Sequence, residues 1–198
     1  MSENSGDETR QNREKINTDS FQTEIFIQKL CRQSPIDLEQ HTVDISALAG
    51  EIWREHYTPI IGAPQVEYML DKLQSAKQIY TDIKENGYVY LTARHKTQGP
   101  MIGYCGIKPA DGYLVISKLY IRRDYRDKGI ARIFLNEVTA LCRYQYMVDK
   151  IRLDVDTHNE DAIAAYKKIG FEIIGLVRDD IGGGFYMEGY TMELSQID

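Results

Sequence analysis

The turn Arg126–Ala131 could bind a phosphate group, because basic side chains and a glycine stand at the start of a helix-like run. It follows a strand-like run, Tyr113–Ile121. Backbone N–H groups in the first turn of a helix lack partners, and the helix dipole adds partial positive charge there. Gly129 lets a phosphate approach the backbone, and Ala131 is too small to block it. A phosphate or pyrophosphate is therefore the expected ligand.

Two better-known phosphate motifs do not occur at this turn. The dinucleotide fingerprint G-x-G-x-x-G fails, because the turn holds a single glycine, and the string G-x-x-x-x-G-K-[ST] occurs nowhere in the chain. The remaining pattern, R-x-x-G-x-A, is a weak signal by itself, and a solvated helix start is the alternative. The basic residues of this region lie within eleven positions: Arg122, Arg123, Arg126, Lys128 and Arg132.

Composition restricts the class of protein and of partner. The chain has 198 residues, 42% hydrophobic and 27% charged, which suits one globular domain. Its net charge of −6 argues against a nucleic-acid partner, since such proteins carry a broad basic surface. A basic island in an acidic chain favours a small anionic ligand.

Cysteine use and hydropathy point to a cytoplasmic protein. Cys31, Cys105 and Cys142 form an odd set without C-x-x-C spacing, so we expect reduced core residues and neither a disulfide framework nor a metal site. No run approaches 18 apolar residues, so no membrane partner is expected. Residues 1–22 read as a disordered polar tail, and residues 23–198 as a single domain.

Apolar periodicity and turn residues predict a mixed α/β (α+β) fold in the order β-α-α-β-β-β-α-β-α-β-β. The three middle strands should form an antiparallel meander. The segment Pro59–Pro64 is expected to be a loop between two helices. The expected strands are 24–31, 88–94, 101–107, 113–121, 150–155, 171–177 and 186–194, and the expected helices are 42–56, 64–73, a further segment to 85, 129–147 and 160–169.

A second motif follows the strand that ends at Val155. Asn159, Ala162, Tyr166 and Gly170-Phe171 form N-x-x-A-x-x-x-Y-x-x-x-G-F, which resembles a signature of the GCN5-related N-acetyltransferase (GNAT) superfamily. The R-x-x-G-x-A turn is similar to the acetyl-CoA pyrophosphate loop of that superfamily. The two motifs begin 33 residues apart, with a helix and a strand between them, as in the family.

The resemblance covers about residues 24–194, is firm from Leu119 to Phe171 and is only topological before Tyr88. One departure is Ala131, where many members have glycine. The resemblance implies a central, mostly antiparallel sheet flanked by helices, with a splay between the fourth and fifth strands. It also implies an acetyl-CoA-dependent N-acetyltransferase that acts by direct attack in a ternary complex.

The resemblance further implies which residues hold acetyl-CoA. Pantetheine would lie like an added strand along Leu119, Tyr120 and Ile121. Asn159 could bond the pantetheine arm, although an asparagine at this point would also cap the next helix. The pyrophosphate would lie against Arg126, Asp127, Lys128, Gly129, Ile130, Ala131 and Arg132.

Tyr166 is the expected general acid, because the thiolate that leaves in acetyl transfer needs a proton and a tyrosine hydroxyl can supply one. The alternative is a tyrosine that packs on the sheet. Gly170 and Phe171 are more typical of a helix end and a core strand.

The general base is not identified. Ser117, in the middle of the third meander strand, is too weak a base, and each acidic candidate could instead be part of a solvated helix face. The candidates are Glu51, Glu55, His56 and Glu67. Residues that could line the acceptor pocket are Trp53, His56, Tyr57, Tyr186, Glu188 and Tyr190.

The acceptor is expected to be the primary amine of a small cationic molecule, because acidic residues gather before the meander at Glu51, Glu55, Glu67 and Asp71. A protein N-terminus or lysine is the alternative acceptor, and a non-catalytic acetyl-CoA-binding module is the alternative class. Exposed Tyr and Ile residues near the last two strands could pair two subunits as a homodimer.

Overall fold

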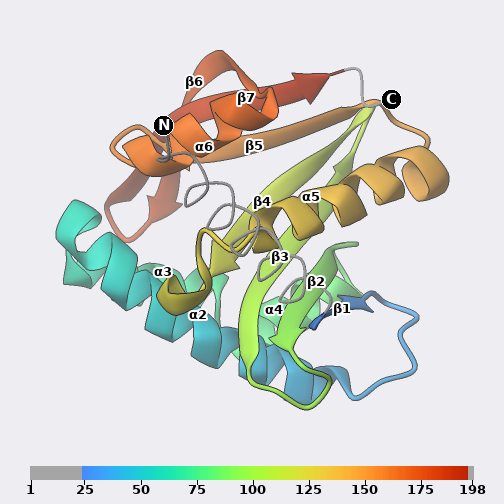
Figure 1. Cartoon of the computed structure of the whole chain (residues 1–198). Helices are drawn as coiled ribbons and strands as arrows, with labels where there is room; N and C mark the ends of the chain where they lie inside the picture. The colour runs from blue at the N-terminus through green and yellow to red at the C-terminus, as the bar shows by residue number, and fades with distance from the viewer. Residues whose placement is uncertain (1–23, 196–198) are drawn as a thin grey trace, which may run out of the picture.

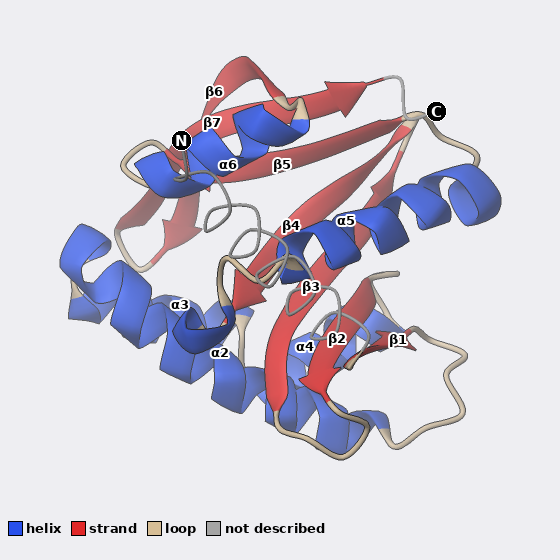
Figure 2. Ribbon diagram, viewed as in Figure 1, coloured by secondary structure: helices blue, strands red, loops and turns tan. Residues whose placement is uncertain are grey.

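A computed structural model describes residues 24–195, and the polar tail predicted over residues 1–22 lies outside them. These residues form a seven-stranded sheet with helices on both faces (Figures 1 and 2). The strands are β1 (Ile25–Leu30), β2 (Val89–His95), β3 (Met101–Ala110), β4 (Tyr113–Ile121), β5 (Lys150–Asp156), β6 (Glu172–Gly182) and β7 (Phe185–Ser195). The helices are α2 (Leu38–Ile61), α3 (Ala63–Leu73), α4 (Ala76–Lys84), α5 (Ile130–Leu141) and α6 (Glu160–Ile169), with the short turns η1 (Arg123–Tyr125) and η2 (Cys142–Tyr146).

The sheet is mixed and mostly antiparallel, as predicted. Its order is β1-β2-β3-β4-β5-β7-β6, and the predicted meander is the run β2-β3-β4. Strand β5 pairs with β4 in parallel and with β7 in antiparallel. Within residues 24–195, β4–β5 is the one parallel pair of neighbouring strands.

Strands β4 and β5 splay apart, as the family resemblance predicted. They pair only where Leu114–Ile116 faces Ile151–Leu153. Beyond these residues, β4 continues to Ile121 and β5 to Asp156 without pairing to each other. Figure 1 shows the two strands diverging like the arms of a V. The β5 side of the last part of β4 is therefore free for another partner.

A β-bulge stands where the splay begins. Gly106 of β3 faces Lys118, and Ile107 faces Ile116, so Ser117 has no opposite residue. Because side chains alternate along a strand, the extra residue reverses which face each later side chain takes. Ile116 and Leu119 thus belong to the same core cluster.

The sheet separates two hydrophobic cores. On one face, α5 and α6 cover a cluster that includes Phe134 and Val138, both fully buried. On the other face, α2, α3 and α4 cover a cluster that includes Ile45 and Ile79. Figure 2 shows α5 and α6 in front of the sheet and α2 to α4 behind it. Each arm of the splay is therefore supported by packed helices.

The predicted loop at Pro59–Pro64 was wrong. Helix α2 runs on through Pro59 to Ile61, and Gly62 at φ 82° is the link to α3. It also begins before the predicted residue 42, at Leu38, where the Asp37 side chain accepts a hydrogen bond from the Gln40 N–H. Eight buried residues anchor this helix, and that packing outweighs the cost of a proline in its last turn.

The predicted helix 129–147 is also interrupted, because α5 ends at Leu141 and a wider π-type turn continues to Tyr146. The last two strands are longer than predicted and meet at the expected glycine turn, where Gly182, Gly183 and Gly184 all have positive φ.

Candidate active site

One cavity of about 1560 Å³ lies along the splay, with walls from α2, α4, β4, β5, α6 and the loop before α5. Of the twelve residues predicted to bind or react, eleven line it. Lys128 does not, and its Nζ lies 5.1 Å from the centroid of the Tyr125 ring. The eleven are Leu119, Tyr120, Ile121, Arg126, Asp127, Gly129, Ile130, Ala131, Arg132, Asn159 and Tyr166.

The loop before α5 has the geometry of an anion site. Gly129 has φ 80° and ψ 4°, which only a glycine adopts without strain, and no side chain caps the helix that begins at Ile130. Arg126 Nε donates to the carbonyl oxygen of Ile121 at 3.1 Å, which ties the loop to the end of β4. The unpaired N–H groups of the first turn suit a phosphate.

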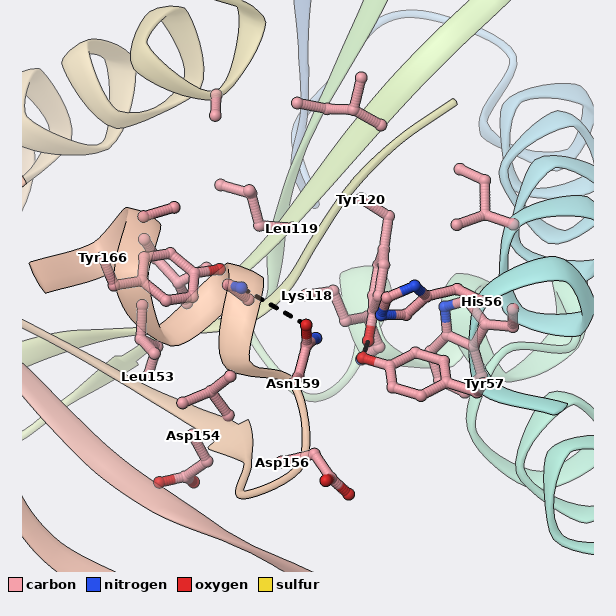
Figure 3. A pocket seen from close by; sticks show the side chains of 18 of the residues that line it. His56, Tyr57, Lys118, Leu119, Tyr120, Leu153, Asp154, Asp156, Asn159 and Tyr166 are labelled. Carbon is pink, nitrogen blue, oxygen red and sulfur yellow. Dashed lines mark hydrogen bonds between the residues drawn. The ribbon is translucent and has the colours of Figure 1, made fainter. Parts of the chain in front are cut away.

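The last part of β4 offers an extended backbone to the cavity. Leu119 and Tyr120 pair with β3 on one side and have no strand partner on the β5 side among the described residues. Free N–H and C=O groups in an extended strand can bind a chain of amides by β-augmentation. Figure 3 shows Leu119 near Tyr166, whereas Tyr120 points to α2.

Asn159 has the capping geometry that sequence reasoning left open. Its Oδ1 accepts a hydrogen bond from the Ala162 N–H at 3.4 Å at the start of α6. The same side chain also lies against His56 and Tyr57 of α2, across the cavity (Figure 3). Asn159 therefore lies both at the start of α6 and at the cavity, so capping the helix and binding a ligand are compatible roles for its side chain.

Tyr166 lies seven residues after Asn159 on the cavity side of α6. Its ring packs edge-on against Phe171, with the centroids 5.5 Å apart, and its hydroxyl points from α6 toward β4 (Figure 3). Burial, followed by the nearby Tyr57 and Cys105, raises the pKa of Tyr166 above its usual value. The hydroxyl therefore keeps its proton at neutral pH and can donate it.

Aromatic residues of α2 and β4 form the opposite wall. The hydroxyls of Tyr57 and Tyr120 lie 3.3 Å apart, and the Trp53 ring packs 5.3 Å from that of Tyr120. Trp53 is 3% exposed, so it is a core residue that also lines the cavity. These contacts hold the end of β4 against α2.

His56 and Glu55 are the two base candidates that line the cavity. Burial, and next Arg126, lower the pKa of His56 below its usual value, while Asn159, Asp161 and Glu55 act in the opposite direction. The imidazole is therefore neutral at pH 7 and can accept a proton.

Each of the three carboxylate candidates for the base is paired with a cation of the chain. Glu51 pairs with Arg122 at 3.3 Å and Glu67 with Arg54 at 2.6 Å, and neither lines the cavity. Glu55 pairs with Arg123 at 3.2 Å.

Of the last-strand candidates, Glu188 lines the cavity, and Tyr186 and Tyr190 do not. Sequence reasoning missed four lining residues on the α4 side. These are Gln78, Asp82, Tyr88 and Lys118. The one signal in the sequence was the charged residue Lys118 in a mostly apolar strand. The face of the sheet that its side chain takes depends on the bulge at Ser117.

Residues 49–171, more than half of the chain, match the Acetyltransferase (GNAT) family. The chain belongs to this family.

Two curated acetyltransferases align with parts of this GNAT chain. It is 28% identical over 99 residues to the L-amino acid N-acetyltransferase AaaT of Escherichia coli K12, across 48% of the chain and 61% of that protein. It is 43% identical over 61 residues to N-alpha-acetyltransferase 50 of Danio rerio, across 31% of the chain and 36% of that protein. The chain thus spans less than two thirds of either relative.

The GNAT fold also appears among solved structures. The PaiA N-acetyltransferase of Thermoplasma acidophilum, determined in complex with coenzyme A, superposes with a TM-score of 0.68. The match is 21% identical and covers 86% of this chain and 98% of the other. The two proteins therefore share a fold.

Within residues 24–195, no group of three or more His, Cys, Asp and Glu side chains could hold a metal ion. No helix in the same range is long and apolar enough to cross a membrane.

The capping bond of Asn159 can be tested without any ligand. Asn159→Ala should lower the free energy of unfolding by about 1 kcal/mol, because the first turn of α6 loses its acceptor. Asn159→Asp keeps an acceptor at the same place and should retain most of the stability. Urea unfolding of both variants measures the difference, and equal stability of the Ala variant and the wild type would contradict the capping role.

Proposed function

We propose that the chain transfers the acetyl group of acetyl-CoA to the primary amine of a small molecule, by direct attack within a ternary complex. The observation that carries this proposal is the cavity in the splay. It joins an anion loop, a free strand edge and a protonated tyrosine in a GNAT chain.

The residues present fit acetyl-CoA. The uncapped start of α5 and the side chains of Arg126 and Arg132 would hold the pyrophosphate. The free edge of β4 at Leu119–Ile121 would pair with the amides of pantetheine, and Asn159 would add a side-chain bond. Acetyl-CoA supplies the activated acetyl group, and the chain supplies its position.

The reaction needs one proton removed and one delivered. The amine nitrogen forms a bond to the acetyl carbonyl carbon, the C–S bond breaks, and the sulfur leaves with the electron pair. Tyr166 would donate a proton to that sulfur, and its raised pKa would keep the proton available until the sulfur gains charge. His56, neutral at pH 7, is our proposed acceptor of the proton that the amine loses, directly or through water.

A non-catalytic acetyl-CoA-binding module has less support than an enzyme. A module that only binds needs no proton donor, yet Tyr166 lines the cavity on the same helix face as Asn159. Acetylation of a protein N-terminus remains an alternative, because a relative of that name aligns with part of the chain. We also propose that two subunits pair as a homodimer through exposed apolar residues of β6 and β7, such as Leu176. A cytoplasmic location is a further proposal.

The pyrophosphate loop predicts a charge-dependent loss of binding. Gly129→Asp should weaken acetyl-CoA binding at least tenfold, or about 1.4 kcal/mol, because it puts a negative charge beside the pyrophosphate. Gly129→Asn is the matched control, since it has the same size and backbone tolerance without the charge. Calorimetry should give the Asp variant a clearly higher Kd than the Asn variant, and similar Kd values for the two would rule out an anion at this loop.

Removing the Tyr166 hydroxyl tests the general acid. Tyr166→Phe should lower the rate of the chemical step by roughly 10²-fold or more, while acetyl-CoA affinity changes by about 1 kcal/mol at most. Single-turnover measurement with saturating acetyl-CoA separates chemistry from product release. Tyr144→Phe, at a residue that is 80% exposed, serves as the control. A Tyr166→Phe enzyme that keeps more than about half the wild-type rate would end the assignment.

The pH profile tests His56 as the base. A base works only when unprotonated, so kcat should fall as pH drops through the lowered pKa of His56, which lies below 6.5. His56→Gln should lose this acidic limb and about 10²-fold in kcat. His41→Gln, whose ring bonds Gln28 outside the cavity, should keep the wild-type profile. An unchanged acidic limb in His56→Gln would assign it to another group.

A further inference from the structure

The α4 end of the cavity contains a buried ion pair that the proposed mechanism does not use. Lys118 of β4 and Asp82 of α4 both line the cavity, with Lys118 Nζ 3.9 Å from Asp82 Oδ2. Their side chains are only 11% and 9% exposed. Gln78 and Tyr88 line the same end.

The bulge at Ser117 directs Lys118 to this end. Because the extra residue reverses the alternation of β4, Lys118 takes the α4 face of the sheet, while its neighbour Leu119 faces the α5 core. On β3, Gly106 leaves room for the lysine stem, since a Cβ there would come within 3.3 Å of Lys118 Cδ. The backbone of β3 and β4 is thus shaped around this side chain.

The ammonium of Lys118 is only partly compensated by the protein. Its Nζ lies 3.9 Å from Asp82 Oδ2, which is too long for a hydrogen bond. It also faces the rings of Tyr88 at 5.0 Å and Tyr90 at 5.7 Å, and the like charge of Lys108 acts on it. Within residues 24–195, this nitrogen donates no hydrogen bond to another protein group. Burial lowers the pKa of Lys118, which agrees with a poorly solvated charge.

Asp82 is held in place by other groups and is less available to a ligand. Its Oδ1 accepts hydrogen bonds from the side-chain amides of Gln78 at 2.9 Å and Asn86 at 3.0 Å. Its Oδ2 is the oxygen that faces Lys118. The Lys118 ammonium therefore faces the cavity with three N–H donors that can serve a ligand. A buried charge of this kind is stabilised by a ligand of opposite charge.

We infer that Lys118 binds a carboxylate of the acceptor, so that the substrate is an amine with a nearby carboxylate, as in an amino acid. This inference rests on the proposed function. Lys118 lines the same cavity as Leu119 and Tyr166, so an anionic group on Lys118 would share this cavity with the attacking amine. A polycationic amine would instead bring like charge to a buried ammonium.

The acidic residues that favoured a cationic acceptor do not offset this argument. Each is exposed and paired with a cation of the chain, so these four carboxylates offer the acceptor little free negative charge. The pairs are Glu51–Arg122, Glu55–Arg123, Glu67–Arg54 and Asp71–Lys72.

The test compares acceptors that differ only in the carboxylate. Release of free CoA thiol is measured with a panel of L-amino acids, their carboxamides, the corresponding decarboxylated amines, and spermidine as a polycation. For the preferred side chain, the wild type should show kcat/KM at least tenfold higher for the amino acid than for its carboxamide. Lys118→Met should lose at least tenfold on the amino acid and less than threefold on the carboxamide.

Two further variants separate recognition from folding. Lys118→Met leaves Asp82 as a buried unpaired charge, so the double variant Lys118→Met/Asp82→Asn removes both charges and should lose the same preference. Lys77→Met changes an exposed lysine of α4, outside the cavity, and should behave like the wild type. Thermal unfolding of each variant checks that it is folded.

The outcomes distinguish a failure of the proposed acetyltransferase function from a failure of the proposed carboxylate site at Lys118. No thiol release with any amine, despite acetyl-CoA binding, would refute the proposed function and with it this inference. Turnover of carboxamides or spermidine as fast as amino acids in the wild type would refute the carboxylate site alone. That comparison needs no variant, so it holds even if both Lys118 variants fail to fold.

Discussion

The limited pairing between β4 and β5 is the constraint on which the rest of the site depends. Three residues of β4, Leu114–Ile116, pair with β5, and the bulge at Ser117 follows at once. A bulge bends its strand and increases its twist, so β4 turns away from β5 at that point. The same residue therefore accounts for the open cleft, for the free strand edge at Leu119 and for the direction of Lys118.

The cleft stays open because each arm has its own support. β4 is held by antiparallel pairing to β3 and by the contact of Tyr120 with Tyr57 of α2. β5 is held along its full length by β7 and carries α6 at its end. Because these contacts hold each strand without a ligand, a ligand finds the backbone edge and Asn159 already in place.

Local signals in the sequence were sufficient for most of the fold. The meander, the loop at Gly129 and the helix after Asn159 depend on alternation, turn residues and caps within a few positions, and all three were predicted. The course of α2 through Pro59 was missed, because burial against other elements decides it. The bulge was missed as well, since it depends on the register between β3 and β4. Lys118 looked like an ordinary strand residue for that reason, and the acidic residues of α2 looked free because their arginine partners lie on other elements.

Because no side chain caps the start of α5, the stability of the protein depends on whether a ligand is bound there. α6 has Asn159 as a cap, but the first turn of α5 has no such acceptor, although this helix provides Phe134 and Val138 to the core. An anion bound at Gly129 completes the helix and is lost on unfolding, so it stabilises the native state by about 2.7 kcal/mol at 100 times its Kd. Fewer molecules are then open to proteases at any moment. The amount of folded protein in a cell would thus rise and fall with the supply of the anion that this loop binds.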